Sequence, residues 1–138
     1  MTIHSIYDLI GQAVFARWND GYYYPGRVDS VGDYEVKISF FDGDNGTAKH
    51  KHVMPLEQGM RELSLQGNWL NRGIFFRGSV SGEQPMIMHY ADGDVEEIQL
   101  AQLRGARPGE TPIVRHIWGA VAVVAIIGAV AFGVSRLR

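Results

Sequence analysis

The sequence predicts a mainly β fold, in which two small β-barrels precede a single membrane-spanning helix. Three observations carry this prediction. Short strands separated by turns fill residues 11–57, a shortened copy of the same pattern occupies residues 67–104, and residues 117–134 contain no charge. A β unit of about 45 residues buries little surface on its own, so we expect the two barrels to pack against each other.

The first unit is predicted from side-chain alternation and from turn signals. Residues 14–18 and 34–40 alternate in the two-residue period of a strand. Asn-Asp-Gly at residues 19–21 predicts a hairpin turn, because aspartate and glycine tolerate positive φ angles. A second turn follows at residues 42–46, and Pro55 ends the unit because proline has no N–H to donate to a neighbouring strand. Four or five strands this short favour a small twisted barrel, since closing the sheet removes its exposed edges.

The second unit is predicted from an internal repeat. Residues 73–80, Gly-Ile-Phe-Phe-Arg-Gly-Ser-Val, repeat the pattern of residues 21–28, Gly-Tyr-Tyr-Tyr-Pro-Gly-Arg-Val, with an offset of 52 residues. Residues 90–94, Tyr-Ala-Asp-Gly-Asp, repeat residues 40–44, Phe-Phe-Asp-Gly-Asp, with an offset of 50 residues. Two matches in the same order predict a second copy of the first unit.

The C-terminal part contains a linker and an apolar run. Residues 105–116 include two prolines and two glycines and predict the linker. As a helix, residues 117–134 would span about 27 Å, close to the ~30 Å thickness of a hydrocarbon core. The run has no polar face, which argues against a buried core helix. We therefore expect a tail-anchored, single-pass membrane protein, and the lack of a secretory signal predicts that its N-terminal units are cytoplasmic.

Small residues recur within the apolar run. Ala125, Ala129 and Gly133 would lie on one face of the predicted helix, a spacing that permits a homodimer through that helix. Because alanine and glycine are frequent throughout the run, chance explains the spacing as readily.

Charge and composition limit the classes of function. Residues 1–103 carry eight Lys and Arg against fourteen Asp and Glu, a net charge of −6, whereas residues 104–138 carry a net charge of +4. An acidic β part argues against nucleic-acid binding and is compatible either with a cationic ligand or with a merely soluble surface. The chain has no cysteine and no motif for a catalytic triad, a phosphate loop or a metal site. We therefore expect a protein that is not an enzyme and that has no cofactor and no metal.

Aromatic side chains of the first unit gather at strand ends, beside turns and a carboxylate. Ring faces attract cations, and one such contact contributes roughly 0.5–2 kcal/mol. A methylated ammonium keeps its charge but is easier to desolvate than a free ammonium, so it suits a pocket of this kind. The alternative is that the same rings are ordinary barrel core.

Four motifs of the first unit occur in a fairly specific order and spacing. They are Ala-Arg-Trp at 16–18, Asp-Gly-Tyr-Tyr-Tyr-Pro-Gly-Arg-Val at 20–28, Val-Lys-Ile-Ser-Phe at 36–40 and Asp-Gly at 42–43. With these motifs the unit resembles a Tudor domain, within the broader group that includes Agenet and chromo-type barrels. The resemblance implies an SH3-like barrel that binds methylated lysine or arginine of a partner protein in an aromatic cage.

Carried over residue by residue, the resemblance implies three cage walls and one acidic residue in the first unit. The walls are Trp18, Tyr24 and Phe40, and the acidic residue is Asp42. The family's cages often have another aromatic residue two positions after the acid, where this sequence has Asp44.

The second unit resembles a diverged Tudor unit, and its cage would contain fewer matching residues. Phe76 matches Tyr24, Tyr90 matches Phe40, and Asp92 matches Asp42. The position of Trp18 falls on Leu70, with Trp69 one residue away, and neighbouring strand residues point to opposite faces.

These features together predict a membrane-anchored protein whose cytoplasmic β units bind a methylated or otherwise cationic side chain of a partner. The alternative is a membrane-tethered scaffold, in which the cage is vestigial and the units bind a partner by strand addition or through an apolar surface.

Overall fold

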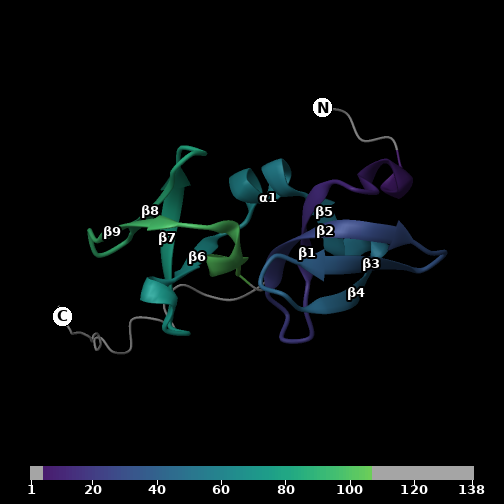
Figure 1. The fold of residues 1–138 in the computed structure, drawn as a ribbon, viewed down its shortest axis with the longest axis horizontal. Coiled ribbons are helices and arrows are strands. Elements are labelled where there is room, and N and C mark those ends of the chain that lie inside the picture. The colour runs from purple at the N-terminus through teal and green to yellow at the C-terminus, as the bar shows by residue number, and fades with distance from the viewer. Residues whose placement is uncertain (1–4, 107–138) are drawn as a thin grey trace. The chain divides into compact units, whose positions relative to one another are not determined.

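The computed structural model describes residues 5–106, which form one antiparallel ten-stranded sheet and one short α-helix (Figure 1). The strands are β1 (Ala13–Arg17), β2 (Tyr23–Val31), β3 (Glu35–Phe40), β4 (Asn45–Lys49), β5 (Val53–Pro55), β6 (Leu65–Asn68), β7 (Phe75–Ser81), β8 (Met86–Tyr90), β9 (Val95–Ile98) and β10 (Leu103–Gly105). The helices are α1 (Leu56–Glu62) and the 3-10 helices η1 (Ile6–Leu9), η2 (His50–His52), η3 (Trp69–Asn71) and η4 (Leu100–Gln102).

The strands fall into two sets with the same pairing order, which we call repeat 1 (β1–β5) and repeat 2 (β6–β10). In each set the first strand pairs with the second and the fifth, the second pairs with the third, and the third pairs with the fourth. Figure 1 shows the labelled strands of repeat 1 on one side of α1 and those of repeat 2 on the other. The predicted β-rich class is therefore present throughout the described residues.

The two sets nevertheless belong to one sheet, which contradicts the predicted fold of two small SH3-like barrels followed by a transmembrane helix. The reason is β10, which pairs with β6 at three positions and with β2 through Gly105 and Tyr23. The strand order is β4-β3-β2-β10-β6-β7-β8-β9, with β1 and β5 joined to β2 through β1. A single long-range strand pair thus makes the sheet continuous.

The membrane prediction is also corrected. In residues 5–106, no helix is long and apolar enough to cross a membrane. The α1 helix has seven residues, whereas a span needs about 20 apolar ones. This finding contradicts the predicted single-pass membrane localisation with cytoplasmic N-terminal units. That prediction, and the predicted helical homodimer, depended on residues 117–134, which lie outside the described residues, as does nearly all of the predicted linker.

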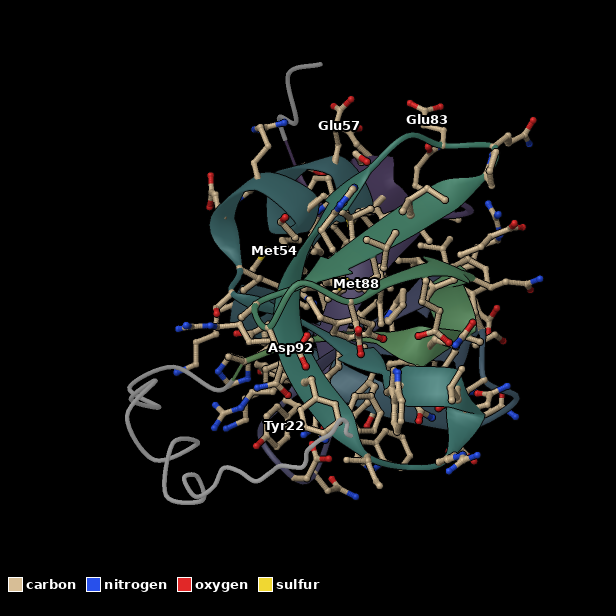
Figure 2. The ribbon with its side chains drawn as sticks, turned by 90° about the vertical axis from the view of Figure 1, so that its left-hand side faces the viewer. Tyr22, Met54, Glu57, Glu83, Met88 and Asp92 are labelled. Atoms are coloured by element: carbon tan, nitrogen blue, oxygen red, sulfur yellow. The ribbon has the colours of Figure 1, made fainter. Side chains whose placement is uncertain are left out.

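The core has one part in each repeat and a third part that joins them. Alternate residues of β3, such as Val36 and Ile38, are buried in repeat 1 as the strand period requires. Met88 is fully buried in repeat 2, and Figure 2 shows it in the middle of that repeat. Phe15 and Tyr23 of repeat 1 pack with Leu65 of repeat 2. Both faces of β1 are therefore buried, one in its own repeat and one between the repeats.

Candidate functional site

In repeat 1, the structure brings two of the predicted cage residues into contact. The rings of Trp18, just after β1, and Phe40, at the end of β3, meet edge to face with centroids 5.3 Å apart. Phe40 is buried, and the indole of Trp18 lies against the backbone of β4. A methyl group built on Gly46 would lie 2.7 Å from the indole, so this ring packs where no side chain fits.

Tyr24 is half-buried and its hydroxyl is engaged in hydrogen bonds. It donates to Oδ2 of Asp20 at 2.6 Å and accepts from Nη1 of Arg104 at 3.4 Å. Burial and then the hydrogen bond to Asp20 raise the pKa of Tyr24 to about 12, so the hydroxyl is protonated at neutral pH. The predicted cage wall therefore also connects β2 to β10.

The predicted acidic residue Asp42 is exposed and shapes the turn after β3. Its Oδ1 accepts a hydrogen bond from the backbone N–H of Asp44 at 3.1 Å, and Gly43 has a φ of +101°. Asp92 is placed in the same way after β8, where its Oδ1 accepts from the N–H of Asp94 at 3.0 Å. Both predicted acids thus have a local role in their turns.

A cation of the chain itself lies between aromatic rings of the two repeats. The guanidinium carbon of Arg104 lies 3.6 Å from the ring centroid of Tyr22 and 3.8 Å from that of Phe75. Its Nε donates at 2.7 Å to Oε1 of Gln66, a side chain that is only 2% exposed. Sequence reasoning missed this residue and counted it only within the basic C-terminal part. The structure thus contains a guanidinium stacked between two rings.

In repeat 2, three rings form a continuous series of edge-to-face contacts, which we call the repeat 2 cluster. Trp69 and Phe76 have centroids 6.1 Å apart, and Phe76 and Tyr90 have centroids 6.4 Å apart. Phe76 is 46% exposed, so part of this cluster faces solvent. The predicted residues Phe76 and Tyr90 are therefore brought together, with Trp69 beside them.

Trp69, and not Leu70, takes the place of Trp18. The N–H of Trp18 donates to the carbonyl of Tyr22, and the N–H of Trp69 donates in the same way to the carbonyl of Ile74, both at 2.9 Å. The loop after the tryptophan is one residue longer in repeat 2 than in repeat 1. An alignment of the repeats on Gly21 and Gly73 therefore places Leu70, and not Trp69, opposite Trp18. An alignment of the two repeats on their tryptophans would have paired Trp69 with Trp18.

Glu96 of β9 places a carboxylate beside the repeat 2 cluster, and sequence reasoning missed it. Its Oε1 accepts from the hydroxyl of Tyr90 at 2.6 Å, and its Oε2 accepts from the backbone N–H of Leu70 at 2.9 Å. Glu96 lies opposite Met88 in the sheet, and Gly46 lies opposite Ile38. Gly46 is therefore the counterpart of Glu96 in repeat 1, and it has no side chain.

Negative charge converges on the repeat 2 cluster. Burial is the first cause that raises the pKa of Tyr90, followed by the hydrogen bond to Glu96 and then by the charges of Glu96, Asp92 and Asp94. The hydroxyl therefore remains a donor, and the field of three carboxylates reaches the ring. Such a field favours a cation at this place.

One groove of the molecule has a different lining. A groove of about 1280 Å³ lies between the repeats, and apolar side chains line it together with the carboxylates of Glu57, Glu83 and Glu97. Figure 2 shows Glu57 and Glu83 at the same edge of the molecule. None of the three rings of the repeat 2 cluster lines this groove. Within residues 5–106, no group of three or more His, Asp and Glu side chains is placed to hold a metal ion.

Comparison with known proteins does not assign the chain to a family. No protein-family model matches the sequence, and a search of curated proteins finds no significant match. What the described part of the chain defines is an antiparallel β protein with an aromatic and acidic cluster at the surface of its second repeat.

Proposed function

We propose that the chain is a protein-binding module that takes a methylated lysine or arginine of a partner on the repeat 2 cluster. The observation that carries this proposal is the contact series Trp69–Phe76–Tyr90 beside the carboxylate of Glu96, with Phe76 exposed to solvent. The resemblance of repeat 1 to a Tudor domain supports the same activity, and a β-rich antiparallel sheet is consistent with that resemblance.

The energetic argument combines rings with charge. A contact between a cation and a ring face contributes roughly 0.5–2 kcal/mol, most when water is excluded. A methylated ammonium loses little hydration when it reaches such rings, and Glu96, Asp92 and Asp94 attract its charge. The chain already uses this chemistry, because Arg104 lies between Tyr22 and Phe75.

Repeat 2 is the better candidate of the two repeats. In repeat 1, the position of Glu96 is occupied by Gly46, and the indole of Trp18 covers it. Arg104 contacts Tyr22 and Tyr24 directly, with its guanidinium carbon 3.6 Å from the ring centroid of Tyr22, whereas the arginine near the repeat 2 cluster, Arg72, lies 5.6 Å from the ring centroid of Trp69. The predicted cage of Trp18, Tyr24, Phe40 and Asp42 is therefore our second choice within the same function.

Peptide titration of the full-length chain tests the proposal. The chain has three tryptophans, so its indole N–H signals can be assigned with the variants W18F and W69F. We expect peptides with trimethyllysine or dimethylarginine to shift the signal of Trp69 at sub-millimolar concentration, and the unmodified peptide to shift it much less. No shift of any indole signal at millimolar peptide would contradict the proposal and favour a scaffold without a working cage.

The variant Phe76→Ala gives a second test with little effect on the core, since its ring is 46% exposed. We expect it to weaken methylated peptide binding about tenfold, the loss of one ring contact. The matched control is Tyr34→Ala, which removes an 84% exposed ring from repeat 1 and should leave binding unchanged. Equal affinities of F76A and wild type would place the ligand elsewhere.

A further inference from the structure

The loop between β6 and β7 contains a residue in a conformation that its side chain disfavours. Leu70 has a φ of +51° and Asn71 a φ of +59°. Asparagine tolerates the left-handed region, whereas leucine is rarely found there because its Cβ approaches the backbone. Strain of this kind persists only where surrounding contacts impose it, and it is concentrated at functional sites.

Three hydrogen bonds with side chains hold this loop in place, in addition to its backbone hydrogen bonds. Glu96 accepts from the N–H of Leu70 at 2.9 Å, and Oδ1 of Asn68 accepts from the N–H of Gly73 at 2.7 Å. The amide of Gln102 donates to the carbonyl of Asn68 at 3.2 Å. The loop is therefore organised before any partner arrives, which lowers the entropic cost of binding.

The strained conformation presents apolar side chains beside the repeat 2 cluster. Leu70 is 50% exposed and Ile74 is 48% exposed, and we call these two residues with Phe76 the apolar rim. Leu70 directly follows Trp69, and the backbone of Ile74 bonds to that of Trp69. Large apolar side chains left exposed at one place mark a contact surface more often than scattered ones do.

Repeat 1 has no such rim at the corresponding positions. The residue that follows Trp18 is Asn19, a polar side chain, and the counterpart of Ile74 is Tyr22, whose ring stacks on Arg104. The exposed aliphatic pair is thus specific to the repeat that also has the carboxylate beside its rings.

We propose that the apolar rim binds a large aliphatic side chain adjacent to the methylated residue of the partner. This inference rests on the proposed function, because the occupant is the segment whose cation lies on the repeat 2 cluster. The carboxylates favour the cation at the Phe76 and Tyr90 end of the cluster, while the guanidinium of Arg72, 5.6 Å from the ring centroid of Trp69, disfavours a cation at the Trp69 end, beside Leu70. A neutral aliphatic neighbour satisfies both conditions.

The test uses the full-length chain and two trimethyllysine peptides that differ only at the flanking positions, which are leucine in one and serine in the other. We expect wild type to bind the leucine peptide about fivefold more tightly, as partial burial of one such side chain gives. Equal affinities would overturn this inference and leave the proposed function standing. If neither peptide binds, both fail together.

The variant Leu70→Asn copies the residue of repeat 1 and suits the left-handed backbone, so it keeps the loop. It should abolish the preference for leucine while the affinity for the serine peptide stays the same. The matched control is Val95→Asn, since Val95 is 61% exposed but alternates with Glu96 and so points to the other face of β9. If V95N removes the preference and L70N does not, the rim is not the contact.

Discussion

Gly46 in repeat 1 and Glu96 in repeat 2 occupy corresponding positions, opposite Ile38 and Met88 in their sheets. The glycine lets the indole of Trp18 pack onto the backbone of β4, which fixes that ring as part of the fold. The glutamate instead binds Tyr90 and the loop that precedes β7, which leaves the rings of repeat 2 beside a charge. The glycine in repeat 1 and the glutamate in repeat 2 therefore give the two sets of rings different surroundings, a strand backbone in one and a carboxylate in the other.

A second pair of corresponding positions shows how the repeats are joined. In repeat 1, Phe15 lies opposite Met54, and both are apolar. In repeat 2, the corresponding pair is Gln66 and Arg104, joined by a hydrogen bond of 2.7 Å. Arg104 also stacks on Tyr22, so the polar pair reaches into repeat 1. The same sheet position therefore contacts the other repeat in both cases, through apolar packing of Phe15 against Leu65 and through the polar pair of Gln66 and Arg104.

The largest expected effect comes from Arg104→Ala. It removes the cation between two rings and leaves the buried Oε1 of Gln66 without its donor, so we expect the free energy of unfolding to fall by about 3 kcal/mol. Urea denaturation measures this. Arg104→Lys keeps the charge but not the planar stack and should lose about half as much. A loss under 0.5 kcal/mol for R104A would mean that the contacts of Arg104 with Tyr22, Phe75 and Gln66 do not hold the repeats together.

The next effect concerns ligand affinity and uses Glu96→Gln. The glutamine side chain has the same shape as glutamate. Its oxygen can accept from the N–H of Leu70, and its NH₂ group can donate to the hydroxyl oxygen of Tyr90, so only the negative charge is lost. We expect affinity for a trimethyllysine peptide to fall about tenfold, measured by calorimetry on the full-length chain. Glu97→Gln, the exposed neighbour on the other face of β9, is the control and should bind as wild type does. Equal losses in both variants would indicate a general charge effect.

The raised pKa of Tyr24 predicts how the stability of the chain depends on pH. The pKa of Tyr24 is about 12 in the folded chain against an ordinary value of 10.0. Because the folded value is the higher one, the stability that the neutral hydroxyl contributes is complete below pH 10 and is lost as the pH rises toward 12. Tyr24→Phe should therefore lose less stability than wild type between pH 10 and pH 12, measured by urea unfolding. Parallel curves would show that Tyr24 does not carry this dependence.

The features that could be read from the sequence are those with a local physical cause. The alternation of residues 35–40 reflects the two faces of β3, although Tyr34, which the same pattern placed inside, precedes the strand and is 84% exposed. The Asp-Gly turns recur with φ angles of +101° at Gly43 and +102° at Gly93. Their aspartates hydrogen-bond the backbone two residues on, which any such turn favours.

The features that could not be read depend on long-range contacts. The pairing of Gly105 with Tyr23 makes one sheet of two, and the contact of Arg104 with Tyr24 joins residues 80 positions apart. No local pattern encodes either. The place of Trp69 was obscured by a single extra loop residue. Glu96 is one of two adjacent carboxylates in β9, and the sequence does not show which of them lies beside the rings.

The smallest expected effect is on stability and concerns Leu70→Asn. Leucine at a φ of +51° is strained, and asparagine adopts this region readily, so we expect a gain of about 0.5–1 kcal/mol in the free energy of unfolding. The side chain is 50% exposed, so little burial is lost. Leu70→Ala separates the relief of backbone strain from the loss of the leucine side chain. Alanine also removes that side chain but keeps the strain, so it should bring no gain in stability. If L70N and L70A destabilise the chain equally, Leu70 is held by packing. A gain in stability with L70N but not with L70A would mean that the exposed leucine destabilises repeat 2, at a position where repeat 1 has asparagine.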